Sequence, residues 1–442
     1  MTILILIAAI AFLLLLITVL RFNAFMALSI TALAVGLVKK MPLDVLLKSI
    51  QTGIGNTLGG LVLVLGFGII LGSLLAETGA ANRIAEGLIH SFGETRAKLA
   101  LALTAFAVGI AMFYNAGFVV LIPLVFSVAA RTGQPLVYLG IAMASALSVT
   151  HGFLPPHPGP TAIVQIFKAD MGKTLLLGFI PAIFAIIAAG LILPEFLKKI
   201  IANPPVGLVE IKAFEASAMP SFAKSFLVAL SPVILMAAGT VGELTLPQES
   251  ILLKNLKFFG DPSVSMLIGV LLAFVFLGNV LDKNFKSKMD ALVIKSTKAL
   301  SAATMILLII AAGGAFKQVL TDSGIGKDIA ALVNNWGLPP LFLGWLVATI
   351  IRIAIGSATV AGLTAAGIVQ PLLLADPSVS KELMALSIGA GSLMCSHVND
   401  TGFWMFKEYF GLSLKDTFRS WTVMETVVGL VGLVVVLILD LF

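Results

Sequence analysis

Charged residues are so sparse in this chain that long apolar runs lie between them. Long runs that contain no Asp, Glu, Lys or Arg include 2–20, 22–38, 49–76, 99–130, 132–167, 174–194, 225–242, 262–281, 299–316, 329–351 and 353–375. A helix needs about 20 apolar residues to cross a hydrocarbon core of about 30 Å, so most of these runs can span a membrane. Strands of a membrane barrel would be shorter, about ten residues, and would alternate in polarity. The sequence therefore predicts an all-α polytopic membrane protein.

Composition supports the same class. Only 11% of the 442 residues are charged and 59% are hydrophobic, whereas soluble domains carry about 25% charged residues. The net charge of +6 does not indicate nucleic acid, because the basic residues lie between apolar runs, where they set the orientation in the membrane. The single cysteine, Cys395, excludes an internal disulfide and a multi-cysteine metal site. We expect no metal and no cofactor.

A polar, proline-containing segment at 195–224 separates a first half, 1–194, from a second half, 225–442. The two halves resemble each other weakly: LLAETGAANRIAEGL (74–88) is similar to VLTDSGIGKDIAALV (319–333). Further on, His151 and the residues after it correspond to His397 and the residues after it. The order of spanning, over-long and broken runs is also shared, which predicts a repeat.

Each half contains one apolar stretch that is too long for a single crossing. A small, polar, glycine-containing patch interrupts each stretch: FYNAG within 97–131 and GSATVAG within 338–375. Such patches favour re-entrant hairpins; the alternative is a pair of ordinary helices with a turn outside the membrane. With the basic connector 282–298 in the cytoplasm, the count is about ten crossings plus two hairpins in two inverted repeats. Inverted repeats of this kind are a recurring plan of secondary transporters.

Each half also contains a broken helix, near 136–168 and near 383–411. GFLPPHPGPT (152–161) must interrupt its helix, because proline removes a donor and blocks helix continuation. SHVNDTG (396–402) gathers polar residues in an otherwise apolar span. The carbonyls and helix N-termini exposed at such breaks can bind ions and hydroxylated anions.

Polar residues at these four breaks are the candidate ligands of a substrate. Arg352 suits a carboxylate, because its planar guanidinium can form bidentate hydrogen bonds to a carboxylate and stays charged. A structural ion pair or an interfacial position is the alternative for Arg352. The candidate substrate contacts are Arg352, Ser357, Thr359, Tyr114, Asn115, His151, Asn399 and Thr401.

Ionisable residues at the same breaks are candidates for proton coupling. Histidine titrates near neutral pH, and an acid inside a membrane span is costly and usually functional. The candidates are His151, His157, His397 and Asp400. Two alternatives stay open: His151 and His397 cap unwound helix ends, or Asp400 forms an internal pair with Arg352 or a histidine.

The motifs GSATVAGLTAAG, THGFLPPHPGPTA and SHVNDTGFWMFKEYFGLSLKDT together resemble those of the gluconate:proton symporter (gluconate permease) family, within the ion transporter superfamily. The resemblance covers essentially the whole chain. It implies proton-coupled uptake of gluconate or a related hydroxy acid across the bacterial inner membrane. It also implies a homodimer in which a domain with two hairpins moves, as an elevator, against a fixed scaffold. Ser357-Ala358-Thr359 looks like one hairpin-tip ligand set of the superfamily, whereas Tyr114-Asn115-Ala116 departs from its serine/threonine pattern.

We therefore expect a proton-coupled symporter for gluconate or a related small hydroxylated monocarboxylate. Alternatives within the class are a sodium-coupled carboxylate carrier and a transporter of another hydroxy or amino acid such as D-serine. An intramembrane enzyme is disfavoured, because we find no nucleophile elbow, zinc spacing or phosphate loop. A passive channel would not accumulate substrate against its gradient.

Overall fold

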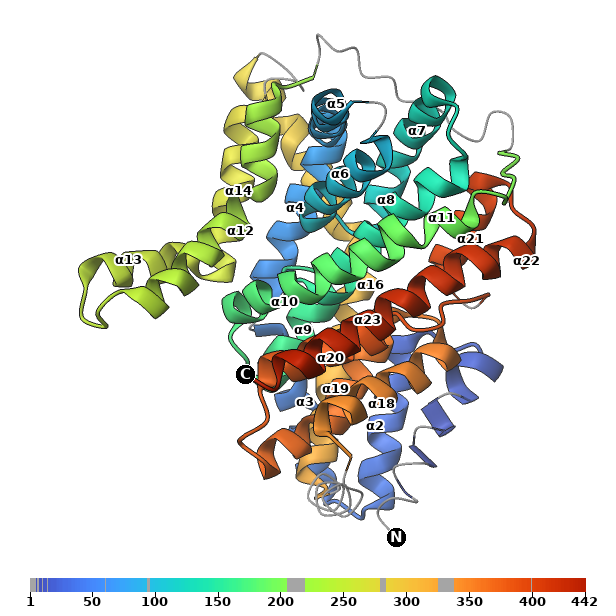
Figure 1. Ribbon diagram of the computed structural model, residues 1–442. Helices are drawn as coiled ribbons and strands as arrows, with labels where there is room; N and C mark the ends of the chain where they lie inside the picture. The colour runs from blue at the N-terminus through green and yellow to red at the C-terminus, as the bar shows by residue number, and fades with distance from the viewer. Residues whose placement is uncertain are drawn as a thin grey trace.

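The computed structural model describes residues 5, 8–9, 11–13, 15–59, 61–93, 96–204, 219–278, 284–324, 338–398 and 400–442. Every regular element within these ranges is a helix (Figure 1). The prediction of an all-α protein with broken helices is therefore confirmed. Asn399, residues 205–218 of the polar linker and most of the predicted repeat segment 319–333 lie outside the described residues.

The described helices fall into two series on either side of the polar linker. The first series is η1 (Leu15–Val19), α2 (Ala24–Val38), α3 (Leu43–Gly59), α4 (Val62–Glu77), α5 (Ala80–Phe92), α6 (Ala97–Ala111), α7 (Tyr114–Thr132), α8 (Leu136–Phe153), α9 (Pro158–Phe167), α10 (Met171–Ala185), η3 (Ile186–Ile192) and α11 (Pro194–Leu197). The second series is α12 (Phe222–Thr245), α13 (Ile251–Gly260), α14 (Pro262–Phe276), α16 (Phe285–Asp322), α18 (Pro340–Ile355), α19 (Ala358–Ala375), α20 (Lys381–Gly391), α21 (Thr401–Phe410), α22 (Leu414–Thr417), η4 (Phe418–Thr422) and α23 (Val423–Leu439).

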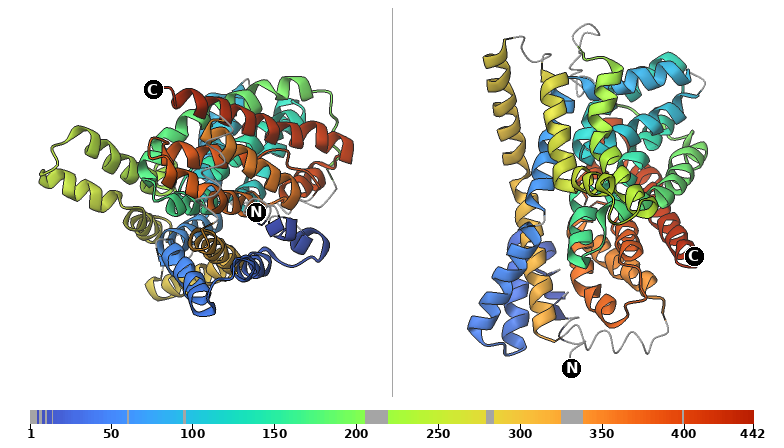
Figure 2. Two further views of the ribbon diagram at one scale, coloured as in Figure 1. Left: turned by 90° about the horizontal axis from the view of Figure 1, so that it is seen from below. Right: turned by 90° about the vertical axis from the view of Figure 1, so that its left-hand side faces the viewer.

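One group of helices forms around α16, which has 38 residues and is about 57 Å long. Helices α2, α3 and α4 pack along it, as Figure 2 shows. The contact with α3 is close: a Cβ on Gly53 would lie 2.4 Å from the Gly314 carbonyl oxygen. The segment 282–298 was expected to connect two spans. The structure instead includes it in α16 from Phe285 onward, because the Asn284 side chain caps the first turn by accepting hydrogen bonds from Lys286 N and Ser287 N.

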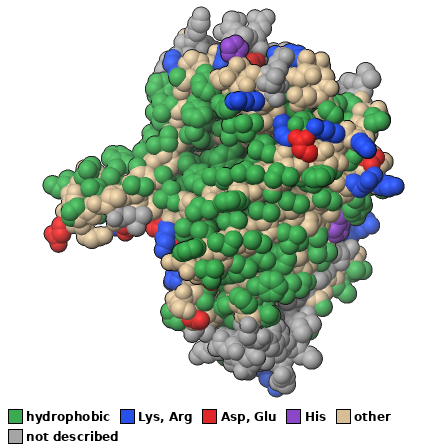
Figure 3. Space-filling view, viewed as in Figure 1, with side chains coloured by type: hydrophobic (Ala, Val, Ile, Leu, Met, Phe, Trp, Pro, Cys, Tyr) green, Lys and Arg blue, Asp and Glu red, His purple; other side chains and the backbone are tan. Residues whose placement is uncertain are grey.

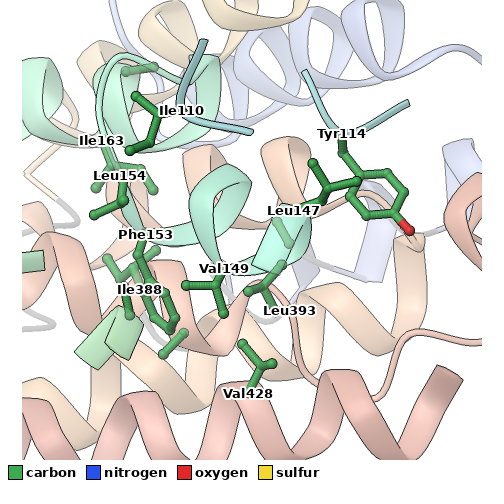
Figure 4. Close-up of a cluster of buried hydrophobic side chains, with 14 of the residues drawn as sticks. Ile110, Tyr114, Leu147, Val149, Phe153, Leu154, Ile163, Ile388, Leu393 and Val428 are labelled. Carbon is green, nitrogen blue, oxygen red and sulfur yellow. The ribbon is translucent and has the colours of Figure 1, made fainter. Parts of the chain in front are cut away.

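A second group of helices forms around α8, which is buried along almost its whole length. Helices α20, α10 and α23 pack against it, with α18 alongside α20. Where α8 passes α20, a Cβ on Gly389 would lie 2.4 Å from the Gly152 carbonyl oxygen. Side chains from both halves interlock here, among them Phe153, Ile388 and Val428 (Figure 4). Because lipid tails are as apolar as these side chains, close van der Waals packing stabilises such a core inside a membrane, and this core holds the broken helices in place.

Much of the outer surface is apolar. Hydrophobic side chains cover most of the face in Figure 3, while Lys and Arg gather toward its upper part. Helix α13 forms an arm with the ends of α12 and α14 that projects from the body in Figures 1 and 2. In the described part of the chain, four helices are long and apolar enough to cross a membrane, or up to six if two bent pairs are each counted as one span. The count of about ten crossings, the hairpin topology and the inverted repeat stay predictions.

Candidate functional site

In two pairs of consecutive helices, a short interruption separates the two helices. Both interruptions coincide with the glycine-containing patches of the sequence. Helix α6 ends at Ala111 and α7 begins at Tyr114. Helix α18 ends at Ile355, and Gly356 follows with a φ of 80°, a left-handed conformation that glycine adopts at no steric cost. Ser357 then caps α19, since its Oγ accepts a hydrogen bond from Val360 N at 3.3 Å. Local residue chemistry thus explains why the chain turns here.

Two further interruptions lie in the proline-rich and the SHVNDTG segments. Helix α8 ends at Phe153, and the prolines that follow delay the next helix until Pro158, which occupies the first turn of α9. Helix α20 ends at Gly391, and α21 begins only after Asp400. The Asp400 carboxylate caps α21 by accepting a hydrogen bond from Gly402 N at 3.0 Å.

The four interruptions open onto one cavity of about 610 Å³. Residues at the N-termini of α7, α9, α19 and α21 line it. A helix N-terminus carries unpaired N–H groups and a partial positive charge, so four of them around one cavity favour an anion. The lining residues are Phe113, Tyr114, Asn115, Ser148, His151, Pro158, Arg352, Ile355, Gly356, Ser357, Ala358, Thr359, Leu393, Asp400, Thr401, Gly402, Trp421 and Glu425.

Arg352 and Asp400 form a nearly buried ion pair at the edge of the cavity. The Arg352 Nη2 lies 2.5 Å from Asp400 Oδ2, and the two side chains are 3% and 14% exposed. The Arg352 Nη1 also donates to the Gly356 carbonyl oxygen. Ser396 Oγ donates to Asp400 Oδ2 and accepts a hydrogen bond from Trp421 Nε1 at 2.8 Å. Of the alternatives for Asp400, the internal pair with Arg352 is the arrangement in this structure.

Glu425 is a second acid in the cavity lining, and it was not among the candidates predicted from the sequence. Its side chain is 1% exposed, and Ser148 Oγ of α8 donates to its Oε1. The signal was present in the sequence: Glu425 is the only charged residue between 420 and 439. Ser148 carried no such signal, since a serine in an apolar helix more often bonds its own backbone.

Four cavity-lining residues have a buried polar atom without a hydrogen-bond partner in the described part of the chain. They are Tyr114 Oη, His151 Nδ1, Arg352 Nε and Glu425 Oε2. Buried polar groups are nearly always paired, and each unpaired group costs about 1–3 kcal/mol. Unpaired groups from four different helices around one cavity therefore indicate a polar ligand.

The three histidine candidates occupy different surroundings. His151 lines the cavity, and its ring lies 5.4 Å from the ring of His157. His157 is 2% exposed and lies behind it, with Nε2 2.6 Å from the Gly109 carbonyl oxygen. His397 is half-buried, with Nε2 2.9 Å from the Ile353 carbonyl oxygen, and does not line the cavity.

The cavity therefore brings together most of the candidate residues from the sequence. Those that line it are Tyr114, Asn115, His151, Arg352, Ser357, Thr359, Asp400 and Thr401. His157 and His397 stand outside the lining, and Asn399 lies outside the described residues. Two other cavities, of about 600 and 740 Å³, lie beside Arg419 and beside Arg131, away from the four interruptions. Nowhere in the described ranges do three or more His, Cys, Asp or Glu residues gather to hold a metal ion.

Comparison with known proteins gives matches over the full chain. The family model for GntP family permeases matches residues 1–442. The chain is 49% identical to a high-affinity gluconate transporter of Escherichia coli strain K12, covering 98% of this chain and 99% of the relative. It is 47% identical to the Gnt-II system L-idonate transporter of the same strain, covering 100% and 99%. A gluconate permease of Bacillus licheniformis is 43% identical, with both chains covered completely.

Two solved structures share the fold at low sequence identity. The Alcanivorax borkumensis YdaH transporter has a TM-score of 0.64 at 16% identity, covering 90% of this chain and 89% of that one. Neisseria gonorrhoeae MtrF, described as illuminating a class of antimetabolite efflux pumps, has a TM-score of 0.58 at 15% identity, covering 90% and 84%. At this identity the likeness concerns the fold alone.

Proposed function

The chain belongs to the GntP family of permeases, and we propose that it imports gluconate or a related small hydroxylated monocarboxylate together with a proton. As a family member it is a multi-pass transporter of the bacterial inner membrane and not an enzyme. The observation that carries the proposal is the cavity on which four helix N-termini and one arginine converge. This arrangement suits one carboxylate better than a dication or a neutral sugar.

The substrate carboxylate would bind near Arg352 and the first turns of α19 and α21. A guanidinium has five N–H donors, and the bonds to Gly356 and Asp400 use two of its three nitrogens. The Nε atom stays without a partner in the described structure, so Arg352 can share its charge with a second carboxylate. Such sharing keeps the guanidinium neutralised whether or not the substrate is present.

The hydroxyl groups of the substrate would meet neutral polar side chains. Tyr114 and Asn115 come from the first half, and Ser357, Thr359 and Thr401 come from the second half. Hydroxyl and amide groups both donate and accept, so they can pair with a chain of hydroxyls. The named substrates of the two E. coli relatives, gluconate and L-idonate, are both hydroxylated monocarboxylates. D-serine stays the alternative substrate, and sodium the alternative coupling ion.

An elevator movement is the mechanism that we propose for alternating access. The group around α16 meets the cavity-bearing group chiefly through α19, with smaller contacts from α9. Both α19 and α9 carry cavity residues at their N-termini. Sliding of these helices along α16 would therefore move the whole site. The homodimer that the resemblance implies is part of the same proposal, and light scattering in detergent tests it.

Cross-linking across the α16–α19 contact tests the movement. A Cβ on Gly367 would lie 3.3 Å from the Lys317 Cβ, near the range that a disulfide needs. In a Cys395→Ser background, the pair Lys317→Cys and Gly367→Cys should lose uptake on oxidation and regain it on reduction. The two single-cysteine variants are the controls. Full uptake by the oxidised pair would refute an elevator that slides along this contact.

The purified protein in proteoliposomes tests coupling and substrate together. We expect uptake of radiolabelled gluconate against its gradient when a pH gradient, acid outside, is imposed alone. A sodium gradient imposed alone should drive none. Accumulation with sodium but not with protons would refute proton coupling. A competition panel of sugar acids and D-serine then ranks the substrates, and D-serine competing better than every sugar acid would overturn the substrate class.

A further inference from the structure

We propose that Glu425, oriented by Ser148, is the group that carries the proton during transport. The inference deepens the proposed function, because it assumes that gluconate or a related acid moves with a proton. Neither residue was among the coupling candidates that the sequence analysis named.

The surroundings of Glu425 suit a carboxyl group that gains and loses a proton. The side chain is 1% exposed on the long apolar helix α23, and yet it lines the cavity. Ser148 Oγ donates to Oε1, which fixes the carboxyl plane. The other oxygen, Oε2, has no partner in the described residues. A protonated Oε2 could donate to a ligand, whereas an ionised Oε2 would leave a charge buried without compensation.

Asp400 also lines the cavity, but it differs from Glu425 in that both of its carboxylate oxygens have partners. It pairs with Arg352 at 2.5 Å, accepts from Ser396 and caps α21. Protonating Asp400 would break these interactions and leave the Arg352 charge without its counter-ion. Asp400 is therefore the structural partner of Arg352, and we assign the exchangeable proton to the other acid.

The charge balance of the cavity leads to the same assignment. Arg352 and Asp400 cancel each other, so an ionised Glu425 makes the lining negative. Adding a substrate carboxylate would put a second uncompensated negative charge into a region of low dielectric constant. One proton on Glu425 removes its charge and lets the anion enter. Substrate and proton then bind together, which is the linkage that a symporter needs.

Other ionisable groups face the same space and must be considered. Tyr114 comes from α7, His151 from α8, Arg352 from α18 and Asp400 from the turn before α21. Helices α10, α20 and η4 also pack against α23, and none of their described charged residues lines the cavity. Those residues are Lys173, Lys381, Glu382 and Arg419. His151 is thus the main competitor for the proton, since its Nδ1 is also without a partner among the described residues.

The proton path conserves atoms at each step. A hydronium ion on the outer side gives its proton to the ionised Glu425 Oε2 and becomes water, and the resulting hydroxyl donates to an oxygen of the substrate. After the site opens inward, the substrate leaves and the same proton passes to water on the inner side. No other co-reactant is needed.

The decisive variant is Glu425→Gln, which keeps the shape of the protonated acid but cannot release a proton. In proteoliposomes we expect it to exchange labelled for unlabelled gluconate at a measurable rate. It should lose accumulation driven by a pH gradient, and it should no longer acidify the lumen when gluconate enters. Exchange shows that the variant is folded. Accumulation driven by pH at the wild-type level would overturn the proposal.

Binding measured against pH gives a second readout. In the wild type, linkage requires the apparent affinity for gluconate to fall about tenfold for each pH unit above the midpoint of the proton site. Glu425→Gln should abolish this dependence. Ser148→Ala should keep the dependence but move its midpoint to higher pH, because the ionised carboxylate loses a donor. If the gluconate affinity of Glu425→Gln depends on pH as in the wild type, the assignment of the proton to Glu425 is wrong. If Ser148→Ala leaves the midpoint unchanged, Ser148 has no part in the proton site.

Two controls complete the experiment: the wild type and a variant that removes an exposed acid. If wild-type uptake responds to sodium and not to pH, proton coupling itself fails, and that result is separate from the choice of Glu425. Glu408→Gln on α21 removes an acid whose side chain is 57% exposed and pairs with Lys407. We expect accumulation, exchange and pH dependence to be unchanged in this control.

Discussion

The two halves of the chain contribute to the cavity in different ways. The first half supplies Tyr114, Asn115, Ser148, His151 and Pro158, none of which carries a fixed charge. The second half supplies every fixed charge of the lining that the structure describes: Arg352, Asp400 and Glu425. Both halves nevertheless present two broken helices with their N-termini toward the cavity.

The two halves have similar backbone geometry at the cavity, but their side chains serve different tasks. Helix N-termini from both halves make the cavity attractive to an anion. The charged residues of the second half would balance the carboxylate and the proton, whereas the uncharged first half would contribute only to the recognition of hydroxyl groups, which it shares with Ser357, Thr359 and Thr401. Changes at the charged residues of the second half should therefore alter stability or coupling, whereas changes at Tyr114 or Asn115 in the first half should alter affinity alone.

Removing the arginine should have the largest effect. Arg352→Gln leaves Asp400 largely buried without its cation, and breaking such a pair costs about 3–5 kcal/mol. Since Asp400 is 14% exposed, we expect a loss near the lower end of this range and no detectable uptake. Thermal unfolding in detergent and proteoliposome uptake measure the two effects.

Two companion variants separate the structural and binding roles of Arg352. The double variant Arg352→Gln with Asp400→Asn should recover stability but not uptake, because no cation remains for the substrate. Arg352→Lys keeps the charge but loses the planar fork, so gluconate affinity should fall while the protein stays folded. Unchanged affinity in Arg352→Lys would assign Arg352 a purely structural role.

The cap of α19 should give the next largest effect. Ser357→Ala removes the hydrogen bond to Val360 N, which costs about 1 kcal/mol of stability, and it also removes a cavity hydroxyl. Ser380 caps α20 in the same way, through Leu383 N at 3.2 Å, but does not line the cavity. Ser380→Ala should thus lose similar stability and keep its gluconate affinity. Equal affinities for the two variants would remove Ser357 from the site.

Local chemistry explains which features were predictable from the sequence. Gly356 and the prolines after Phe153 interrupt helices through their own backbone constraints, so the interruptions could be placed without tertiary information. The polar residues beside them could be identified for the same reason. The helical conformation of the basic segment from Phe285 onward could not be predicted in the same way, because its lysines indicate an exposed segment and an exposed segment can still continue a helix.

Long-range contacts explain what the sequence did not reveal. Arg352 and Asp400 are 48 positions apart, and both an ion pair and a substrate contact were compatible with their residue types. Ser148 and Glu425 are 277 positions apart, so neither predicts the other. Only the packing of α8 against α23 brings them together. The cavity is thus a product of tertiary structure, although each of its helix interruptions is local.

A smaller effect is expected at the uncharged tip of α7. Asn115→Ala removes an exposed cavity-lining amide, and losing one neutral hydrogen bond costs about 1 kcal/mol, or roughly fivefold in affinity. Stability and the proton-to-gluconate ratio should not change. Asn115→Asp is the matched variant: an acid suits a helix N-terminus, so the helix should tolerate it, but its charge should repel the substrate and weaken binding further. Tighter gluconate binding by Asn115→Asp would contradict the division between the halves.

The smallest effect on coupling is expected at His151, the first-half residue that could most directly overturn that division. His151→Gln keeps a neutral polar side chain in the cavity and removes the imidazole. If Glu425 carries the proton, the variant should still accumulate gluconate in a pH gradient, with the wild-type proton-to-gluconate ratio and only a modest change in affinity. The ratio is measured by recording lumen acidification and labelled uptake in the same vesicles. If accumulation disappears in His151→Gln while exchange persists, the proton belongs to the first half. The second half would then bind the substrate carboxylate, whereas the first half would carry the proton. The comparison of the halves would hold for the carboxylate and be reversed for the proton.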